Sequence, residues 1–491
     1  MGSPASSSSS SLGDGDRNGG GGRRKKKDLG WIEWARGWCG IVGEFLFQRI
    51  AASYLENPLS LPPLDGITCI VTGATSGIGL EIARQLAQSG AHVVMAVRKT
   101  ILAHELIQKW QDEKAEMGLP LNVEVMELDL LSLDSVVRFA EAWNARLGPL
   151  HALINNAGIF SIGEPQRFSK DGYEEHMQVN HLAPALLSML LLPSLLRGSP
   201  SRIINVNSIM HSVGFVDTED MNLTSGKRTY TSYLGYSNSK LAQVKFSSIL
   251  HKRIPAEAGI SVVCVSPGIV HTNVARDLPK MVVTAYHLIP FFIFDAQEGS
   301  RSTLFATTDP QVPEYCGVLK ADEWPVCAYI SHDCRPMNPS EEAHNLETSQ
   351  EVWEKTLDMI GLPSDALEKL IEGEEVQCRY GSGGETCTSL SSYPKSNKQN
   401  ISLILMILGD HRCIDCDACR WMAPEIFTRI DEQSAVIKQP SCEEERIKAL
   451  QALLSCPTSS IHTEKPTKKI LEVQKMFPLP VDEQTLPVYC F

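Results

Sequence analysis

Residues 70–79 read Ile-Val-Thr-Gly-Ala-Thr-Ser-Gly-Ile-Gly, a short apolar strand that runs directly into a glycine-rich turn. The pattern of an amphipathic helix follows at 80–86. Gly73 would allow the tight turn, Gly77 would leave room for a pyrophosphate, and Gly79 would let the helix pack closely on the strand. Because a helix N-terminus offers free N–H groups and a positive dipole end to phosphates, the stretch predicts a dinucleotide site. The other predicted lining residues of this turn are Thr72, Thr75, Ser76 and Ile78.

The whole chain has the composition of a globular protein with more than one domain. It has 491 residues, 43% of them apolar and 21% charged, so two or three domains are expected. The net charge of −13 argues against nucleic acid as a general partner. No apolar run reaches the length needed to span a bilayer.

Strand-like runs alternate with helical patterns around the glycine-rich turn, an order that builds a parallel sheet from βαβ units. We therefore predict an α/β fold, a Rossmann-type doubly wound parallel sheet with helices on both faces. The expected strands are 67–72, 92–97, 122–127, 151–155, 202–206 and 260–265. The expected segments are a disordered Ser-, Gly-rich and basic tail at 1–28, an amphipathic helix and linker at 29–61, the α/β domain with a helical C-terminal extension at 62–378, a linker at 379–407, a small cysteine-containing domain at 408–465 and a tail at 466–491.

The ends of the next strands carry residues suited to a nicotinamide cofactor. Arg98, with Lys99 beside it, follows the second strand, where an arginine accommodates the 2′-phosphate of NADP and an acidic residue would hold the ribose of NAD. Arg98 therefore favours NADP(H), and the alternative is a solvated basic pair at a strand end. Asp129 closes the third strand and would accept a hydrogen bond from the adenine amine. The remaining predicted cofactor residues at these strand ends are Leu130, Asn156, Ala157 and Gly158.

Two further segments carry groups suited to proton transfer. Ser208 ends the strand at 202–206, at the edge where open α/β sheets bind ligands. Tyr236 and Lys240 lie four residues apart, on one face of a predicted helix. The ammonium would lower the pKa of the phenol from about 10 toward the working pH. Such a pair arises often by chance, but here it follows the glycine turn, the arginine and the serine in order.

In this order of motifs, residues 62–300 resemble the short-chain dehydrogenase/reductase family. The resemblance implies that Tyr236 exchanges the proton of the substrate oxygen and that Lys240 also binds the nicotinamide ribose. It also implies that Ser208 polarises the carbonyl and that Asn180 holds a proton-relay water. The stretch 31–385 is similar to a plant subgroup, the FOREVER YOUNG-type oxidoreductases, related to retinol dehydrogenases and the WW-domain oxidoreductase. That likeness implies an apolar alcohol or carbonyl substrate.

The family's nicotinamide-contacting turn is matched by Pro267-Gly268-Ile269-Val270-His271-Thr272, with Thr272 near the carboxamide. One departure is that Asn207 precedes Ser208, where the family usually has a second serine. The apolar stretch 281–294 is either a lid over an apolar pocket or a buried helix or partner surface. His211 is interpreted as a structural or substrate-edge residue, because Tyr236 already fills the catalytic role.

A second constellation lies near the C-terminus. Cys413, Cys416 and Cys419 are spaced by two residues, and Cys456 is followed by proline. This pattern resembles a single-cluster ferredoxin, a small α+β domain holding one [4Fe-4S] cluster over about residues 408–465. Zinc is the competing interpretation, since four thiolates also bind zinc, but zinc sites usually show two paired Cys-x-x-Cys knuckles.

The two sites are not expected to exchange electrons directly. A nicotinamide gives up two electrons as a hydride, a cluster moves one, and no flavin site that could split the pair is evident. The cysteine segment is then a tethered electron carrier with its own redox partner, or a join of two reading frames. Besides the NADP-dependent oxidoreductase, two other functions remain: a dinucleotide-binding redox sensor or scaffold with little turnover, and an electron-transfer protein in which only the cluster domain acts.

The N-terminal region suggests a membrane surface. Gly2 fits the myristoylation pattern, and residues 23–27 are all basic. The helix that begins at Trp31 places Trp31, Trp34, Trp38, Ile41 and Phe45 three and four apart, with Glu44 and Gln48 on other faces. The alternative is that this helix docks on the α/β domain. A cytoplasmic location or a peripheral membrane location is expected, and the acidic Asp14 and Asp16 disfavour a chloroplast transit peptide.

Overall fold

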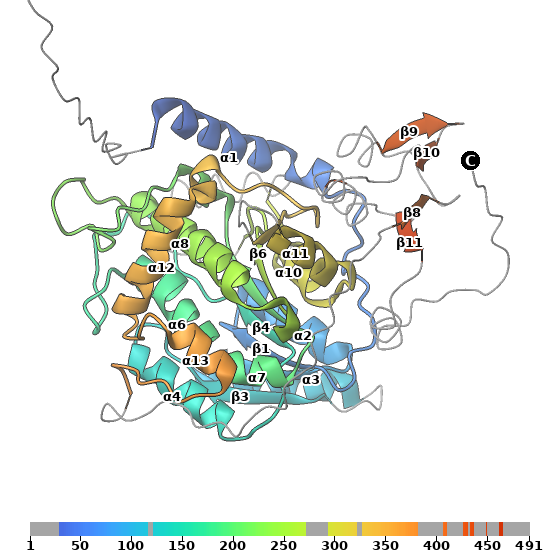
Figure 1. Ribbon diagram of the computed structural model, residues 1–491. Coiled ribbons are helices and arrows are strands. Elements are labelled where there is room, and N and C mark those ends of the chain that lie inside the picture. The colour runs from blue at the N-terminus through green and yellow to red at the C-terminus, as the bar shows by residue number, and fades with distance from the viewer. Residues whose placement is uncertain are drawn as a thin grey trace, which may run out of the picture.

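The computed structural model describes residues 29–115, 121–271, 293–321, 327–381, 406–409, 426–430, 433–436, 448 and 461–464. Its centre is a parallel sheet of seven strands in the order β3-β2-β1-β4-β5-β6-β7 (Figure 1). The strands are β1 (Thr68–Thr72), β2 (His92–Val97), β3 (Val123–Glu127), β4 (Ala152–Asn155), β5 (Ser201–Val206), β6 (Ile260–Val265) and β7 (Ala328–Ile330). The six predicted strands are confirmed, each within one residue at its start. The short β7 was not predicted, because its three residues lie in a region of helical pattern.

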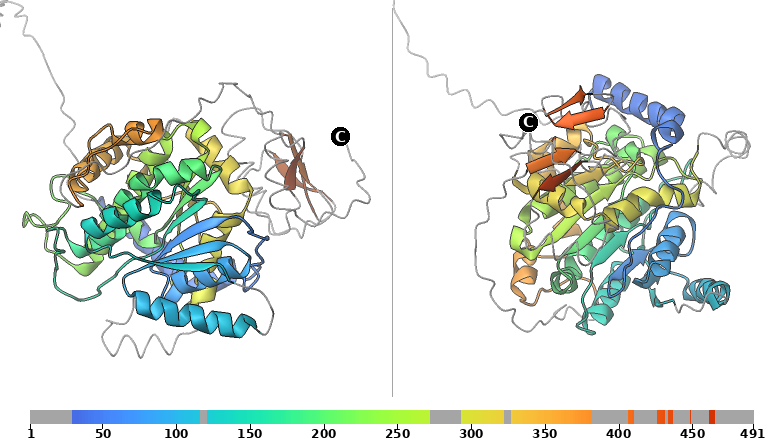
Figure 2. Two further views of the ribbon diagram at one scale, coloured as in Figure 1. Left: turned by 90° about the horizontal axis from the view of Figure 1, so that it is seen from below. Right: turned by 90° about the vertical axis from the view of Figure 1, so that its right-hand side faces the viewer.

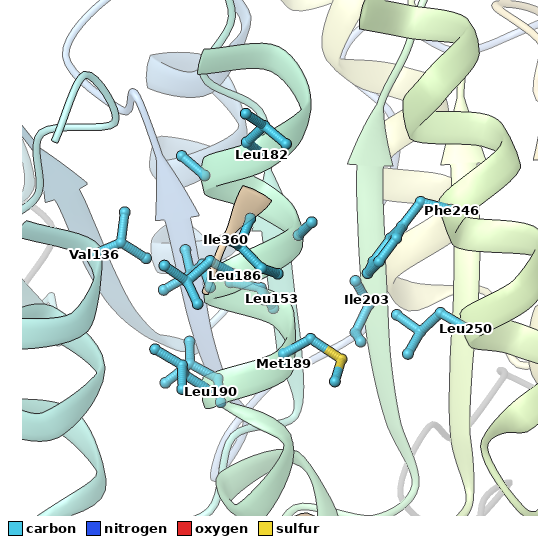
Figure 3. Close-up of a cluster of buried hydrophobic side chains, with 14 of the residues drawn as sticks. Val136, Leu153, Leu182, Leu186, Met189, Leu190, Ile203, Phe246, Leu250 and Ile360 are labelled. Carbon is cyan, nitrogen blue, oxygen red and sulfur yellow. The ribbon is translucent and has the colours of Figure 1, made fainter. Parts of the chain in front are cut away.

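Helices cover both faces of the sheet, as predicted (Figure 2). One buried apolar cluster joins the sheet to α4, α6, α7, α8, α12 and α13, and a second joins it to α2, α3, α10 and α11. Figure 3 shows part of the first cluster, with Leu186 and Met189 of α6 lying between strand residues such as Ile203 and neighbouring helices. These helices are α2 (Gly77–Gln88), α3 (Thr100–Ala115), α4 (Leu133–Asn144), α6 (Ala183–Leu190), α7 (Leu192–Arg197), α8 (Ser232–Arg253), α10 (Ala296–Thr308), α11 (Gln311–Ala321), α12 (Leu346–Met359) and α13 (Ala366–Glu372).

Short helical turns connect these elements. The run from β4 to α6 contains α5 (Glu175–Met177) and a five-residue π-helix, η1 (Gln178–Leu182). The 3₁₀ turns are η2 (Ile209–Val213), η3 (Ala256–Ala258) and η5 (Glu341–His344). A π-helical turn often marks a functional site, because it displaces one residue from the regular helical ladder.

The N-terminal helix α1 (Trp31–Ala51) docks on the α/β domain along one face. A Cβ at Gly37 would lie 2.7 Å from the carbonyl oxygen of Ser212, so the helix backbone approaches η2 closely. The polar side chain of Gln48 is buried, whereas Trp31 is 78% exposed. Docking on the domain, one of the two alternatives for this helix, is thus observed, with a polar residue on the inner face. Within the described ranges no helix is long and apolar enough to cross a bilayer.

Four short strands are described near the C-terminus. β8 (Met406–Gly409) pairs antiparallel with β11 (Ile461–Glu464), and β9 (Phe427–Ile430) pairs with β10 (Gln433–Val436). The β8–β11 pair brings together the two ends of the predicted cysteine domain. The predicted tails at 1–28 and 466–491, most of the linker at 379–407, and Gly2 lie outside the described residues.

Candidate active site

The predicted dinucleotide turn lies where the strand order changes direction, between β1 and β4. Ligands of open α/β sheets bind at such a switch point, outside the carboxyl ends of the strands. The Oγ1 of Thr72 accepts hydrogen bonds from the N–H groups of Asn156 and Ala157, both at 3.0 Å. The Nδ2 of Asn156 donates to the Thr72 carbonyl at 2.8 Å. These bonds join the ends of β1 and β4 into one rigid edge.

The glycines of this turn are required by its geometry. Gly73 and Gly77 have φ angles of +68° and +56°, in the left-handed region that favours glycine. A Cβ on Gly79 would lie 2.2 Å from Nδ2 of Asn156 and 2.6 Å from the Gly73 carbonyl oxygen. The close approach predicted at Gly79 is therefore present, and its partners are the Asn156 amide and the turn itself. Thr75, Ser76 and Ile78 complete the segment that leads into α2.

Arg98 and Asp129, which are predicted to contact the adenosine half of the cofactor, follow the ends of β2 and β3. In the part of the chain that the structure describes, no hydrogen bond or ion pair engages Arg98 or Lys99, and both are exposed. Oδ1 of Asp129 accepts from the Leu131 N–H at 3.1 Å. The buried Leu130 offers its carbonyl to Gln178 at 3.3 Å. Within the described ranges, the end of β2 thus presents two exposed cationic side chains.

Ser208, Tyr236 and Lys240 meet at the carboxyl end of β5. Tyr236 forms a hydrogen bond with the Ser208 side chain. Nζ of Lys240 lies 5.7 Å from the Tyr236 ring centroid and donates to the carbonyl of Val206 at 2.8 Å. A serine that follows β5 and a tyrosine and a lysine of α8 thus share one site.

The prediction for the pKa of Tyr236 is wrong for the unliganded protein. Burial raises the pKa of Tyr236 to about 12, although the hydrogen bond with Ser208 acts in the opposite direction. Burial also lowers the pKa of Lys240 to about 8. The physical reason is that removing a charged group from water opposes the ionisation of both side chains. The phenol is therefore protonated at neutral pH.

Asn180 lies in η1 and is tied to the same site. Its Oδ1 accepts from the Ile159 N–H at 2.8 Å, and its Nδ2 donates to the Ile159 carbonyl and to Oγ of Ser239, both at 3.0 Å. Its carbonyl accepts from Nε2 of Gln243 at 3.0 Å. Sequence reasoning missed Ser239 and Gln243. Their spacing of three and seven residues from Tyr236, which places them along the same helix, would have been the signal.

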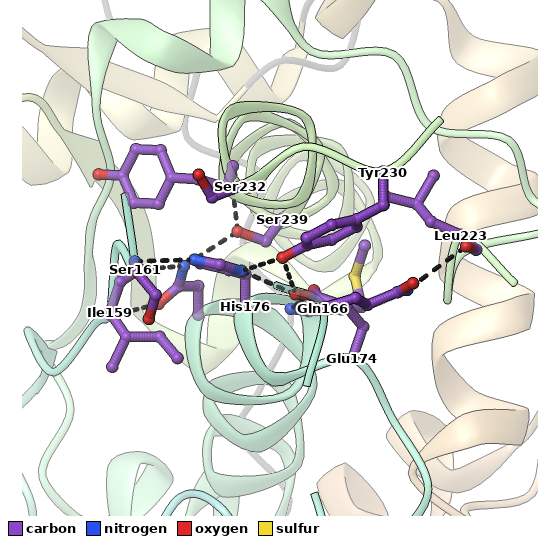
Figure 4. A network of polar contacts seen from close by, with 12 residues as sticks. Ile159, Ser161, Gln166, Glu174, His176, Leu223, Tyr230, Ser232 and Ser239 are labelled. Carbon is purple, nitrogen blue, oxygen red and sulfur yellow. Dashed lines mark hydrogen bonds and ion pairs between the residues drawn. The ribbon is translucent and has the colours of Figure 1, made fainter. Parts of the chain in front are cut away.

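A buried polar network supports the loop beside Tyr236 (Figure 4). Nε2 of His176 accepts from the Ser161 N–H at 3.1 Å, so its Nδ1–H donates to Glu174 at 2.7 Å. Tyr230 also donates to Glu174, at 3.1 Å. This network, also missed from sequence, holds the loop that carries Phe160. The Phe160 ring stacks on Tyr236 at a centroid distance of 4.2 Å.

Asn207 and His211 connect the catalytic strand end to distant segments. Nδ2 of Asn207 donates to the Lys240 carbonyl at 2.9 Å. The asparagine that stands in place of the family's usual serine therefore links the end of β5 to α8. His211 is buried, lies 2.8 Å from the Ser208 carbonyl through Nδ1, and accepts from the Ser340 N–H at 3.1 Å. With both ring nitrogens bound to backbone groups, His211 has a structural role, one of the two roles interpreted from sequence.

The turn Pro267–His271 lies at the carboxyl end of β6. Gly268 has a φ of +81°, and Phe294 pairs with this turn through Val270. Thr272 and residues 281–292 lie outside the described residues, and Ile293 and Phe294 at the end of the apolar stretch are buried. Cys413, Cys416, Cys419 and Cys456 also lie outside them. Within the described ranges no three side chains form a metal-binding group.

This arrangement of sheet, glycine turn, serine, tyrosine and lysine defines an oxidoreductase that binds a nicotinamide dinucleotide. Residues 68–219 match the family model "short chain dehydrogenase", and residues 410–463 match the "4Fe-4S single cluster domain of Ferredoxin I". The chain belongs to the short-chain dehydrogenase/reductase family. Both the predicted family and the predicted second module are confirmed.

Three named relatives show which members of the family the chain resembles. The chain is 69% identical over 359 residues to the dehydrogenase/reductase SDR family member FEY of Arabidopsis thaliana, covering 73% of this chain and 96% of that protein. It is 33% identical over 318 residues to human retinol dehydrogenase 11, covering 65% and 92%. It is 33% identical over 322 residues to mouse polyprenol dehydrogenase, covering 64% and 90%. A retinol dehydrogenase-like relationship is therefore established.

Proposed function

We propose that the protein interconverts an apolar alcohol and its carbonyl, with NADP(H) as the hydride carrier. The observation that carries this proposal is the convergence of Ser208, Tyr236 and Lys240 beside the Gly73–Gly79 turn. A bound nicotinamide would supply or accept the hydride. The turn residues, Asn156 and Lys240 would hold the cofactor, and the positive φ angles of Gly73 and Gly77 and the rigid strand edge described above fit a dinucleotide.

Each polar side chain then has one role. Because the pKa of Tyr236 is raised to about 12, its phenol is protonated at neutral pH and can donate a proton to a carbonyl oxygen. Ser208, already hydrogen-bonded to Tyr236, would hold the same oxygen. Asn180 fastens Ile159 and Ser239 in place, and its carbonyl retains a second lone pair for a water.

The preference for NADP(H) rests on Arg98. A guanidinium that has no partner among the described residues can bind a 2′-phosphate at this strand end through charge-assisted hydrogen bonds. Replacement of Arg98 by Gln should raise the dissociation constant for NADPH about 10-fold and leave that for NADH unchanged. Fluorescence titration with the two cofactors measures both values. Equal changes for NADPH and NADH would contradict the proposed role of Arg98.

The substrate class rests on the aromatic surface beside Tyr236. Phe160 stacks on Tyr236 and meets Tyr233 edge-on at 5.4 Å, so apolar rings line one side of the site. Relatives named for retinol and polyprenol act on long apolar alcohols, which supports the same class here. Oxidation of NADPH with retinal or prenyl aldehydes, compared with short polar aldehydes, tests this. Tight NADPH binding without turnover of any aldehyde would favour the sensor function instead.

We also propose that residues 410–463 hold one [4Fe-4S] cluster through Cys413, Cys416, Cys419 and Cys456. The family match and the ferredoxin-like spacing support this ligand set. The purified protein should be brown and bleach on reduction, and Cys416→Ser should lose the colour. Cys442→Ser, in the same segment but outside the motif, is the matched control. A colourless protein with stoichiometric zinc would overturn the cluster assignment.

Peripheral membrane contact is a third proposal, carried by the outer face of α1. Ile32, Val42, Phe47 and Ile50 are each more than half exposed, and a basic run precedes the helix at 23–27. An apolar helix face beside clustered cations suits an anionic lipid surface. Phe47→Glu should abolish sedimentation with phosphatidylserine-containing vesicles. Ile101→Glu, at an exposed apolar position on α3, should bind like the wild type, and equal binding of both variants would refute this contact.

A further inference from the structure

Helix α1 reaches the turn that follows β6. Gln48, near the C-terminal end of α1, is only 1% exposed. Its Nε2 donates to the Ile269 carbonyl at 3.0 Å, and its Oε1 accepts from the Ile269 N–H at 2.8 Å. The side-chain amide therefore pairs with Ile269 as a neighbouring strand would. A buried amide that satisfies both backbone groups of one residue fixes the position of that residue.

The shape of the turn is fitted to this amide. Gly268 precedes Ile269 with a φ of +81°. A Cβ at Gly268 would lie 2.8 Å from Oε1 of Gln48 and 3.1 Å from Cβ of His332. The backbone can approach α1 this closely only because residue 268 has no side chain.

The next residue of α1 holds the chain segment on the other side of the turn. Nη2 of Arg49 donates to the Ile293 carbonyl at 2.7 Å, and the guanidinium binds both oxygens of Glu298, at 2.7 and 3.0 Å. Phe294 donates its N–H to the Ile269 carbonyl at 3.0 Å, so the two segments are themselves joined. Consecutive residues of α1 thus hold both segments, and the base of the turn is fixed from outside the sheet.

We propose that Gln48 is a positioning residue for the nicotinamide-contacting turn, so that α1 forms part of the cofactor site. This inference rests on the proposed function, because it takes Pro267–His271 as the turn that contacts the nicotinamide. Without the amide, the Ile269 carbonyl loses one of its two hydrogen-bond donors and the Ile269 N–H loses its acceptor. The turn is then free to shift. The cofactor then binds a turn that it must first order, which weakens binding.

The test uses the full-length protein and NADPH binding measured by fluorescence titration. Gln48→Met keeps the length and apolar stem but removes both hydrogen bonds, and should raise the dissociation constant about 10-fold, or about 1.4 kcal/mol. Arg36→Met is the matched control. Arg36 lies on the same helix as Gln48, but it pairs with Glu341 of η5, away from the turn. The variant should bind NADPH like the wild type.

Gln48→Glu provides a readout that a general loss of packing would not reproduce. A protonated carboxyl has one donor and one acceptor, as the amide does, whereas a carboxylate has only acceptors. Gln48→Glu should therefore bind NADPH weakly at pH 8 and approach wild-type affinity at pH 6. Gln48→Met should stay weak at both values. The wild type at the same pH values corrects for the charged and titratable groups described around this contact, which are Glu44, Arg49, His271, Glu298 and His332.

The outcomes separate this inference from the function on which it rests. A wild-type protein that binds neither NADPH nor NADH overturns the proposed function and the inference with it. A wild type that binds NADPH, with Gln48→Met binding equally well, overturns the positioning role alone. An affinity of Gln48→Glu that does not change with pH, relative to wild type, also overturns it.

Discussion

The two backbone turns that flank the candidate site are held in place in different ways. The Gly73–Gly79 turn is fastened by Thr72 and Asn156, which lie at the ends of adjacent strands. The Pro267–His271 turn is fastened by Gln48, which lies 221 residues before Ile269 in the chain. One turn is thus built from its own motif and the neighbouring strand, and the other depends on a helix outside the sheet. A sequence motif reflects local backbone geometry, so only a turn held by its own motif and the neighbouring strand can be predicted from sequence.

The largest expected effect is at Tyr236, the proposed proton donor. Tyr236→Phe removes the proton donor but keeps the ring that stacks on Phe160. The turnover number for aldehyde reduction should fall about 10²- to 10⁴-fold, the usual contribution of general acid catalysis. Absorbance of NADPH at a saturating aldehyde concentration measures this.

Cofactor affinity serves as the control for Tyr236→Phe. Neither turn contacts the phenol oxygen in the described hydrogen bonds, so NADPH binding should stay within about 3-fold of wild type. Turnover that survives in Tyr236→Phe would show that the proton comes from elsewhere and would remove the central role of this site.

The second prediction disrupts the locally built turn. Gly79→Ala places a methyl group 2.6 Å from the Gly73 carbonyl oxygen, a backbone atom that cannot move without opening the turn. We expect a loss of about 3 kcal/mol of stability, at the upper end of overpacking costs, together with a loss of NADPH binding. Urea denaturation followed by tryptophan fluorescence measures the stability.

Gly40→Ala is the matched control for that substitution. Gly40 is also helical, but among the described residues no atom lies within 4 Å of the position that a Cβ would occupy. This variant should be stabilised by about 0.5–1 kcal/mol, because alanine favours a helix more than glycine does. If Gly79→Ala were as stable as wild type, the close packing of the first turn would not constrain its sequence.

The same contrast explains what could be predicted from sequence. Six strands, the α/β fold and the residues at the strand ends follow from apolar runs, glycine spacing and the order of motifs. The short β7 could not be predicted, since three residues such as Ala328–Ile330 give no periodic signal. Gln48 looked like a solvent-facing residue of an amphipathic helix, yet it is buried while Trp31 is exposed. Helical periodicity alone does not tell which face a distant domain will cover.

The third prediction concerns the long-range contacts around Ser208. Burial lowers the pKa of His211 to about 4, whereas in the unfolded chain it is near 6.5. The unfolded state therefore binds more protons below pH 6.5, and the folded state loses stability as pH falls from 6.5 toward 4. Between pH 7 and pH 5 this histidine should account for about 2 kcal/mol of lost stability.

His211→Gln tests that assignment. The variant should lose about 2 kcal/mol less than wild type when urea denaturation is repeated at pH 7 and pH 5. An identical loss in both proteins would mean that other groups carry the acid sensitivity and that protonation of His211 does not oppose folding.

The smallest expected effect is at the second turn and distinguishes its two constraints. Gly268→Ala must adopt a φ of +81°, which costs about 1–2 kcal/mol for a residue with a side chain. It must also displace Oε1 of Gln48, 2.8 Å from the new methyl group. That oxygen belongs to a flexible side chain, so the amide can move away, at the expense of its bonds to Ile269.

In a Gln48→Ala background those bonds are already absent, and Gly268→Ala should cost less by about 0.5–1 kcal/mol. Urea denaturation of the two single variants and the double variant gives this coupling directly. A cost that is the same in both backgrounds would show that the turn keeps its shape without α1, and the two turns would then be built alike.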